Sequence, residues 1–228
     1  MNISIIIPTF KEKENIKNLI NLIKSKIESS NIIIVDDSPD ESIKFEIKNL
    51  KDVKYIYRGK KLGRGSAVIE GLNIAQKNFQ SEIFIEMDAD LSHDPKELMN
   101  FVRNLDENPF VIGSRYILGG KCEMKGTRLM ISKIGNLVIK IFSKINSNEF
   151  TTSFRGFNIK KLKNFHLNDV KETGYSFFMG TLFELEKKNF YIKEIPITFA
   201  DREQGISKIP RLEIFRTIKN LINYVLKK

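Results

Sequence analysis

Short runs dominated by apolar residues alternate with amphipathic segments through the first half of the chain. Strands are predicted at residues 3–7, 32–35, 53–57, 83–87 and 110–112, where β-branched and aromatic residues prevail. Apolar residues recur at helical spacing in residues 14–28 and 66–78, and Asp94-Pro95 opens a further helix. Apolar strands that alternate with helices are typical of a mostly parallel sheet covered on both faces. We therefore expect a doubly wound, Rossmann-like α/β domain.

The second half of the chain has a different pattern. Residues 127–144 and the segment after Pro210 each have apolar residues at helical spacing, with lysine and arginine interspersed. Basic amphipathic helices can lie on a membrane surface, although most amphipathic helices pack on the rest of their own protein. No stretch reaches the ~18 uninterrupted apolar residues of a membrane span. We expect one domain over residues 1–210 and a C-terminal basic amphipathic helix over residues 211–228.

The composition narrows the choice of partners. The 228-residue chain carries a formal net charge of +10, which favours an anionic partner such as a phosphate, a nucleic acid or an acidic membrane surface. Nucleic acid is disfavoured, because the cations stand beside carboxylates at predicted strand ends and no RNA-binding aromatic motif occurs. Cys122 is the single cysteine, which excludes an intrachain disulfide and a thiolate zinc cluster. Without a signal-peptide pattern in the first residues, we expect a cytoplasmic location.

Two carboxylates stand close together after the strand predicted at residues 83–87. Asp88 and Asp90 would lie at the edge where open α/β sheets bind ligands. Mg²⁺ and Mn²⁺ favour oxygen ligands, and Mg²⁺ is often held by one or two carboxylates plus substrate phosphates. The alternative is an acidic turn that caps a helix, since Asp94-Pro95 followed by Glu97 is a good helix start by itself.

Loops rich in glycine and cations surround this pair in the predicted sheet. Residues 58–67 form a Gly-rich loop that opens a helix, where backbone amides can approach an anion, but its spacing is not that of a P-loop. Arg115, Arg128, Arg155 and the loop at 201–208 add further cations. Arginine suits bidentate phosphate binding. With a divalent cation, these groups indicate a site for a diphosphate and another phosphate.

Motifs along nearly the whole chain, in order, resemble those of family 2 glycosyltransferases. They are Pro8-Thr9-Phe10-x-Glu12-x-Glu14-Asn15, Val35-Asp36-Asp37, Lys61-Leu62-Gly63-x-Gly65-Ser66-Ala67 and Asp88-Ala89-Asp90-Leu91-Ser92-His93. Within that group, the chain resembles dolichyl-phosphate mannose synthases in Gly113-Ser114-Arg115-Tyr116, Ser153-Phe154-Arg155 and Asp201-Arg202-x-x-Gly205-x-Ser207-Lys208.

The resemblance implies a GT-A fold and an activity at the membrane surface. The expected reaction is metal-dependent transfer of a sugar, with inversion, to a polyprenyl phosphate such as dolichyl phosphate. Mannose from GDP-mannose is the favoured donor, and a UDP-sugar such as UDP-glucose or a different acceptor is the alternative. A basic binding protein and an idle subunit are less favoured alternatives. We expect peripheral association with the membrane, with a membrane-protein subunit as an optional partner.

The resemblance also implies roles for individual residues. Mg²⁺ or Mn²⁺ would be held by Asp88 and Asp90. The catalytic residues would be Asp90, Arg115 and Arg128, the arginines balancing phosphate charge as the nucleotide leaves. The nucleotide would be bound by Pro8, Thr9, Glu12, Asp36, Asp37, Gly63, Asp88 and Ala89. The acceptor phosphate would be bound by Ser153, Arg155, Arg202, Ser207 and Lys208.

The chain departs from the family pattern at two places. Ser92 stands where some relatives carry a metal-contacting Gln, and the Gln and Glu of Gly-Tyr-x-Phe-Gln-x-Glu are replaced by Phe178 and Gly180. If that acid were a required base, the chain would be inactive or Glu184 would have to substitute. A phosphate monoester has its second pKa near ~6 and is largely dianionic at neutral pH. Such an acceptor needs no general base, and we favour this interpretation.

Overall fold

The structure, a computed structural model, describes residues 1–171, 174, 176–200 and 211–227. Its strands are β1 (Ile3–Thr9), β2 (Asn31–Asp36), β3 (Val53–Tyr57), β4 (Ile83–Glu86), β5 (Phe110–Ser114), β6 (Lys121–Cys122), β7 (Arg155–Asn158), β8 (Ile192–Pro196) and β9 (Thr198–Phe199). Its α-helices are α1 (Lys13–Lys26), α2 (Ser42–Ile47), α3 (Arg64–Phe79), α4 (Leu98–Glu107), α5 (Gly126–Ser143), α6 (Ser176–Lys187) and α7 (Arg211–Lys227). Short 3-10 helices span Pro95–Glu97 and Leu167–Asp169.

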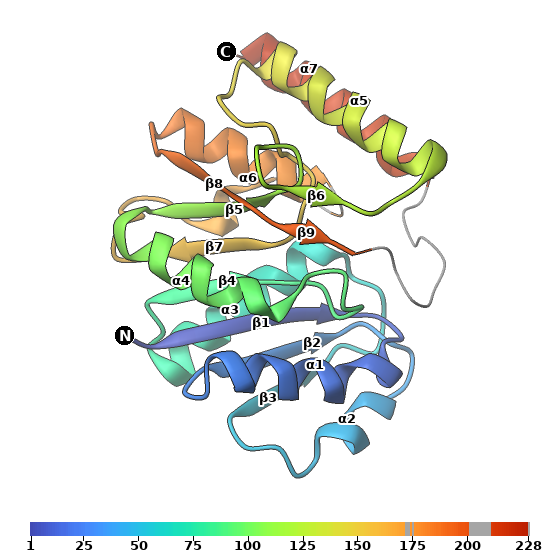
Figure 1. The fold of residues 1–228 in the computed structure, drawn as a ribbon, viewed down its shortest axis with the longest axis vertical. Helices are drawn as coiled ribbons and strands as arrows, with labels where there is room; N and C mark the ends of the chain where they lie inside the picture. Colours follow the sequence, from blue (N-terminus) through green and yellow to red (C-terminus); the bar gives the residue numbers. More distant parts are fainter. Residues whose placement is uncertain (172–173, 175, 201–210, 228) are drawn as a thin grey trace.

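A seven-stranded sheet with the order β3-β2-β1-β4-β7-β5-β8 forms the centre of the molecule (Figure 1). β1 pairs in parallel with β2 and β4, β2 with β3, and β5 with β8. The strands predicted from apolar runs are all present, so the mostly parallel α/β fold is confirmed. β7 runs antiparallel between β4 and β5, and the sequence pattern did not reveal it.

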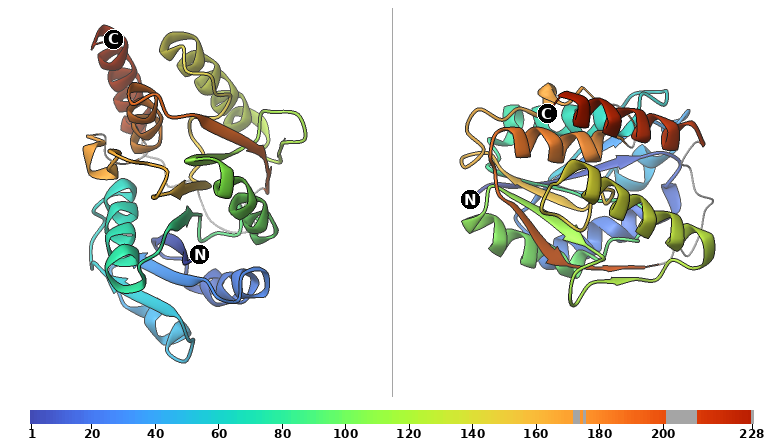
Figure 2. Two further views of the ribbon diagram at one scale, coloured as in Figure 1. Left: turned by 90° about the vertical axis from the view of Figure 1, so that its left-hand side faces the viewer. Right: turned by 90° about the horizontal axis from the view of Figure 1, so that it is seen from above.

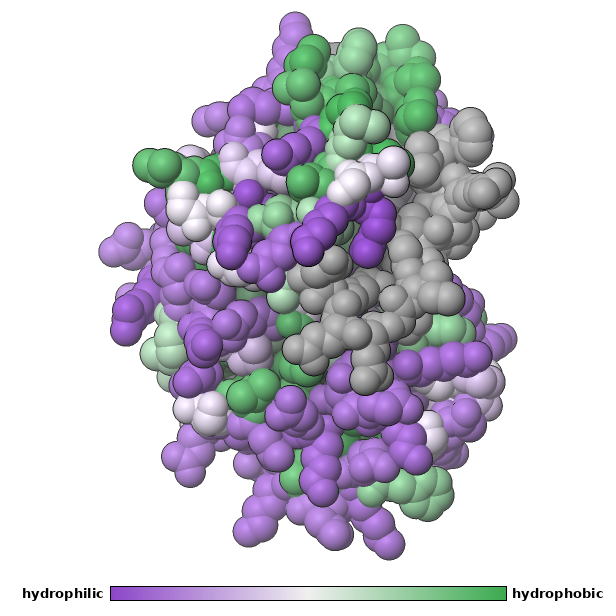
Figure 3. Space-filling view, turned by 45° about the vertical axis from the view of Figure 1, so that its right-hand side comes forward, coloured by the Kyte–Doolittle hydropathy of each residue, from purple (hydrophilic) through white to green (hydrophobic). Residues whose placement is uncertain are grey.

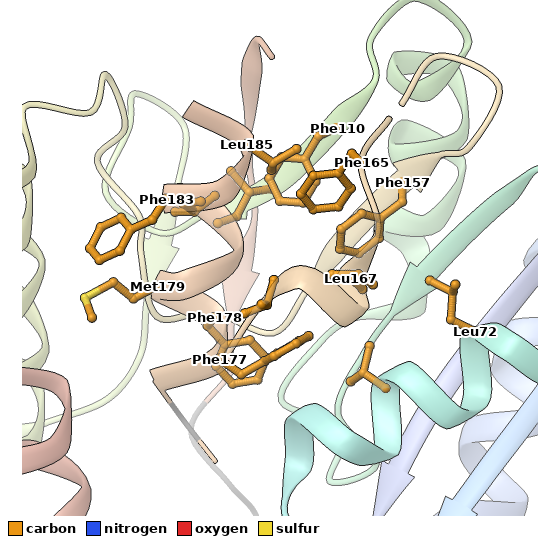
Figure 4. Close-up of a cluster of buried hydrophobic side chains, with 14 of the residues drawn as sticks. Leu72, Phe110, Phe157, Phe165, Leu167, Phe177, Phe178, Met179, Phe183 and Leu185 are labelled. Carbon is orange, nitrogen blue, oxygen red and sulfur yellow. The ribbon is translucent and has the colours of Figure 1, made fainter. Parts of the chain in front are cut away.

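Helices cover both faces of this sheet (Figures 1 and 2). One core lies under α1, α2 and α4, and the other lies under α3 and α6. In the second core, Phe110 of β5 and Phe157 of β7 lie on the same side of α6 as Leu185, whereas Phe183 points to the other side of this helix, where it meets Tyr224 (Figure 4). A continuous apolar strand is required wherever both faces are buried, which explains the residue pattern of β1, β2 and β4.

α5 and α7 lie side by side at one end of the molecule (Figures 1 and 2). α7 packs on α6, where the rings of Phe183 and Tyr224 stack with centroids 3.7 Å apart. α5 buries Asn136, Ile139 and Ser143. We call its exposed apolar residues the α5 stripe: Met130, Ile131, Ile134, Leu137, Val138, Ile141 and Phe142.

The apolar face of α5 is therefore turned outward instead of onto the sheet. Ile218, Ile222, Val225 and Leu226 of α7 are also exposed. Figure 3 shows hydrophobic side chains gathered at this end of the molecule. In the described part of the chain, no helix is long and apolar enough to cross a membrane.

The close approach of α3 to the sheet gives a test of the packing. A Cβ added at Gly71 would lie 2.6 Å from Cγ2 of Ile6 on β1, whereas one added at Gly135 on α5 would meet nothing within 4 Å. Overpacking costs about 1–3 kcal/mol, and alanine regains up to about 1 kcal/mol in helix propensity. Gly71→Ala should therefore lower the free energy of unfolding in urea, and Gly135→Ala should leave it unchanged or raise it. A Gly71→Ala protein as stable as the wild type would contradict the packing of α3 on β1.

Candidate active site

The carboxyl ends of β1, β2 and β4 meet at one edge of the sheet, and the acidic residues follow directly. Thr9 and Asp36 are register partners at the ends of β1 and β2, and the Thr9 hydroxyl donates to Asp36 at 3.0 Å. Asp36 is fully buried and also accepts from the Ser38 amide and hydroxyl and from the Tyr55 hydroxyl. Burial and this hydrogen bond to Asp36 raise the pKa of Tyr55. Asp36 thus shapes the edge through contacts within the protein.

Asp37 connects the same edge to the Gly-rich loop. Its carboxylate accepts from Nε of Arg58 at 2.5 Å and from the Leu62 amide at 3.0 Å. Arg58 also donates to the Ser66 hydroxyl and to the Gly63 carbonyl, at 2.9 and 3.2 Å. Gly63 has φ of +100°, in the region that favours glycine. The loop is therefore fixed against β2 by a buried ion pair.

Asp88 and Asp90 lie in the turn after β4. Asp88 accepts from the Ser153 hydroxyl at 2.7 Å, and Asp90 accepts from the Ser92 hydroxyl at 2.5 Å. Within the described residues, no cluster of three or more His, Cys, Asp or Glu side chains could hold a metal ion. A pair of carboxylates nevertheless suits Mg²⁺, which commonly takes one or two carboxylates and completes its shell with phosphate oxygens and water. The donor set fits a metal that binds together with a phosphorylated substrate.

His93 supports the turn from beneath. Its Nδ1 accepts from the Asp88 amide at 3.0 Å, and its ring stacks on Phe154 with centroids 4.7 Å apart. Burial lowers the pKa of His93, so the ring is neutral near pH 7. Nδ1 is then the unprotonated nitrogen, because it accepts a hydrogen bond. His93 is a structural residue of this turn.

Arg64 and Glu86 enlarge the charged cluster, and neither was identified from the sequence. The guanidinium of Arg64 donates to Oδ1 of Asp88, and its Nε lies 3.4 Å from Oε1 of Glu86. Arg64 also lies over the Phe178 ring, 5.5 Å from its centroid. Burial raises the pKa of Glu86 to about 7. The signal available in the sequence was a lone acid inside the apolar strand Ile83-Phe84-Ile85-Glu86, since buried acids are paired or functional.

Comparisons with known proteins bear on the family and the fold of this chain. The family model described as "Glycosyl transferase family 2" matches residues 4–166. The chain is 30% identical over 212 residues to a polyprenol monophosphomannose synthase of Mycolicibacterium smegmatis, covering 90% of this chain and 80% of that protein. It is 31% identical over 214 residues to an undecaprenyl-phosphate mannosyltransferase of Micrococcus luteus, covering 92% of this chain and 88% of that protein.

The chain belongs to glycosyl transferase family 2. It is therefore a glycosyltransferase, and the resemblance seen in its motifs is confirmed. The fold also matches a glucosyl-3-phosphoglycerate synthase of Mycobacterium tuberculosis, solved with Mn²⁺, UDP and phosphoglyceric acid. The TM-score is 0.70 at 14% identity, covering 99% of this chain and 78% of that one. This likeness confirms the GT-A fold.

Most of the residues predicted to bind nucleotide in this glycosyltransferase lie at one edge. Pro8, Thr9 and Ala89 are buried at strand ends or in the turn that follows, and Glu12 directly precedes α1. Arg128 is exposed in the first turn of α5. Arg202, Ser207 and Lys208 lie outside the described residues. Their predicted contact with an acceptor phosphate stays a prediction.

Arg155 lies in the core of the protein. It is fully buried, and it donates to the carbonyls of Phe150, Thr152 and Phe178 at 3.0, 2.7 and 2.5 Å. Burial lowers its pKa to about 10, so the side chain stays charged at neutral pH. With these donors committed to backbone carbonyls, we assign Arg155 a structural role in place of the predicted phosphate contact.

Arg115 is held in a buried ion pair with Glu149. Its Nε and Nη2 donate to the two carboxylate oxygens at 2.7 and 2.8 Å, and Nη2 also donates to the Thr151 hydroxyl. Burial alone would lower the pKa of Arg115, but the charge of Glu149 outweighs burial and raises it. In this arrangement the guanidinium fixes the segment around Thr151.

This ion pair predicts a large and recoverable loss of stability. Removing one partner of a buried pair typically costs about 3–5 kcal/mol, because an uncompensated charge is left inside. Glu149→Gln should lower the free energy of unfolding on this scale, and Arg115→Met in the same protein should restore at least half of the loss. The exposed pair Lys121–Glu123 is the control, and Glu123→Gln should cost less than about 1 kcal/mol. Equal effects of the two Gln substitutions in guanidinium titrations would contradict the buried pair.

Proposed function

We propose that this glycosyltransferase transfers a sugar, with inversion, from a nucleotide diphosphate donor to a polyprenyl phosphate. The observation that carries the proposal is the Asp88–Asp90 pair at the ligand-binding edge of the sheet, in a chain about 30% identical to enzymes named for polyprenyl-phosphate mannose synthesis. These names support mannose as the sugar, and we propose GDP-mannose as its donor. A UDP-sugar is the alternative, because the fold neighbour was solved with UDP.

Asp88 and Asp90 would hold Mg²⁺ or Mn²⁺ against the diphosphate. When bound, the metal would stabilise the charge that develops on the nucleoside diphosphate leaving group. Ser153 and Ser92 orient the two carboxylates through hydrogen bonds of 2.7 and 2.5 Å. Ser92 thus contributes through Asp90, at the position where some relatives carry a metal-contacting Gln.

The nucleotide would lie over the ends of β1 and β2. Asp37, Thr9, Pro8 and Glu12 are our proposed contacts, with Gly63 allowing close approach of the loop that Arg58 fixes. Asp36 accepts hydrogen bonds from the hydroxyls of Thr9 and Tyr55 and acts by holding these two side chains in place. We therefore propose that Asp36 positions the pocket and that Asp37 lies nearer to the ligand.

The acceptor chemistry explains why the missing acid at Gly180 is tolerated. A phosphate acceptor is already an anion near pH 7 and attacks without a general base. It requires cations that hold it beside the sugar, and we propose Arg128 with the predicted residues Arg202, Ser207 and Lys208. Phe178 and Gly180 offer no base, since neither side chain carries an acid or an amide.

The α5 stripe gives this enzyme a surface that suits a membrane. Beside it lies a cavity of about 890 Å³ between α5 and residues 115–122, whose lining includes Lys121, Lys133 and Lys140. Apolar side chains flanked by lysine are the pattern of a helix that lies in the interface of an anionic bilayer. Because a polyprenyl phosphate is itself a membrane lipid, we propose that the enzyme acts while peripherally bound to a membrane, or to a membrane-protein subunit, through this end.

A panel of labelled donors tests the activity. We expect transfer of mannose from GDP-mannose to polyprenyl phosphate, with the product extracted into organic solvent, and no turnover when EDTA removes the metal. UDP-glucose and UDP-N-acetylglucosamine should give little product. If every donor is consumed while the label stays in the aqueous phase, the lipid acceptor is rejected. If a UDP-sugar is the preferred substrate, GDP-mannose is rejected as the donor.

Two neighbouring aspartates provide matched variants for the metal site. Asp90→Asn should lower the transfer rate by about 100-fold or more, the scale of losing charge stabilisation in a transition state. Asp94 only caps the helix start, where its carboxylate accepts from the Lys96 amide. Asp94→Asn should keep nearly full activity, because asparagine is an equally good cap. Similar rates for the two variants would contradict a metal at Asp90.

Liposome flotation tests the membrane surface. The double substitution Ile134→Glu and Ile141→Glu places two anions in the α5 stripe, and we expect it to abolish co-flotation with vesicles that contain phosphatidylglycerol. Phe45 is 76% exposed on α2, and α2 lies at the opposite end of the molecule from α5 and α7 (Figure 1). Phe45→Glu should float like the wild type. Loss of flotation in both variants, or in neither, would count against the α5 stripe.

A further inference from the structure

We propose that Arg64 sets the metal affinity of the Asp88–Asp90 pair by competing with the divalent cation for Asp88. The competition would make metal binding weak without the nucleotide and stronger when the nucleotide diphosphate is bound. The inference rests on the proposed function for the identity of the metal site. It adds a positioning role for a residue that the motifs leave open, the x of Gly63-x-Gly65.

The first step in the argument is that one carboxylate oxygen serves two donors. Oδ1 of Asp88 accepts from the Arg64 guanidinium and from the Ser153 hydroxyl. A carboxylate oxygen has about two lone-pair positions, so a metal ion at Oδ1 must replace one donor. Ser153 is neutral and tolerates a nearby divalent cation. Arg64 carries a charge of the same sign as the metal, which makes it the donor that is displaced.

The second step is that the guanidinium has support after it leaves Asp88. Nε of Arg64 lies 3.4 Å from Oε1 of Glu86, and within the described residues Oε2 of Glu86 has no hydrogen-bond partner. The Phe178 ring lies beneath Arg64, 5.5 Å from ring centroid to Cζ. A cation over an aromatic face is stabilised without any specific hydrogen-bond geometry. Arg64 can therefore move between anions while it stays over Phe178.

This arrangement also accounts for the departure from the family pattern at Phe178. A glutamine at this position could offer an amide oxygen and an amide nitrogen, whereas a phenyl ring offers only its face. Phe178 is 2% exposed, and its ring contacts Arg64 on the side of the site and Arg155 in the core, with Cζ of Arg155 4.9 Å from the centroid. The Phe178 ring thus supports the charged guanidinium of Arg64 beside the proposed metal site.

The third step is the effect of the diphosphate. A phosphate group beside the metal gives the displaced guanidinium a new anionic partner, and arginine binds phosphate in a bidentate manner. Without nucleotide, Arg64 and the metal compete for Asp88, so the charge of Arg64 weakens metal binding. With a diphosphate present, the same charge stabilises the complex of protein, metal and nucleotide. Coupling of this kind is reciprocal, so the metal should strengthen nucleotide binding by the same factor.

The test measures Mn²⁺ binding to the full chain by the electron paramagnetic resonance signal of free Mn²⁺, with and without GDP. The variants are Arg64→Met, Arg64→Gln and Arg64→Lys, and Mn²⁺ bound by GDP alone is subtracted. Without GDP, we expect Arg64→Met and Arg64→Gln to bind Mn²⁺ about 10-fold more tightly, since one nearby like charge is removed. With GDP, this advantage should vanish or reverse. Arg64→Lys should resemble the wild type.

Controls separate this inference from the proposed function. Arg103 is exposed on α4, and Arg103→Met should leave the Mn²⁺ dissociation constant unchanged. Arg64→Gln keeps a hydrogen-bond donor without the charge, so tightening in Arg64→Met alone would indicate repacking and overturn the inference. Equal affinities in wild type and both neutral variants would overturn it while the metal site stands. Mn²⁺ binding that is unaffected by Asp90→Asn would overturn the metal site and this inference together.

Discussion

The buried guanidinium of Arg155 is the contact on which the second half of the structure depends. It begins β7, stands opposite Glu86 in the antiparallel ladder, and donates to carbonyls of the preceding loop and of α6. A buried cation whose nitrogens donate to buried carbonyls resists displacement, because leaving any of these groups unsatisfied is costly. Through these bonds β7 is fixed between β4 and β5. Ser153 then reaches Asp88, and Phe178 comes to lie beneath Arg64.

The carboxylates near the candidate site form ion pairs with arginines. Cations that the sequence suggested as phosphate ligands therefore have carboxylate partners within the protein. Asp37 pairs with Arg58, Asp88 with Arg64, and Glu149 with Arg115. An arginine next to glycine and serine gives the same sequence pattern whether it binds a ligand or a buried carboxylate. Only the fold distinguishes Arg58 and Arg64, which pair with carboxylates that follow β2 and β4, from Arg155, which is surrounded by backbone carbonyls.

The sequence predicted the first half of the fold closely, because continuous apolar strands are required where both faces of a sheet are covered. β7 was missed because Arg155-Gly156-Phe157-Asn158 has neither an apolar run nor clear alternation, and an antiparallel insertion is set by tertiary contacts. α6 was missed because it is apolar on nearly every side and lacks helical periodicity. α5 was predicted as a helix. The direction in which its apolar face points is set by contacts with segments distant in the sequence, and the sequence of α5 alone does not reveal these contacts.

The small sheet of β6 and β9 connects the turn that carries Asp88 and Asp90 to α5. His93 forms an antiparallel bridge with Phe199 of β9, and the Ala200 amide donates to the Ser92 carbonyl at 3.1 Å. β9 pairs in parallel with β6, which leads within a few residues into α5 at Gly126. A surface formed by the α5 stripe is therefore held at a fixed position relative to Asp88 and Asp90. If that surface lies on a bilayer, the bridge between His93 and Phe199 and the hydrogen bond between Ala200 and Ser92 would set the depth at which a lipid phosphate meets the donor. Substitutions in this sheet should then alter use of a membrane acceptor more than binding of the nucleotide.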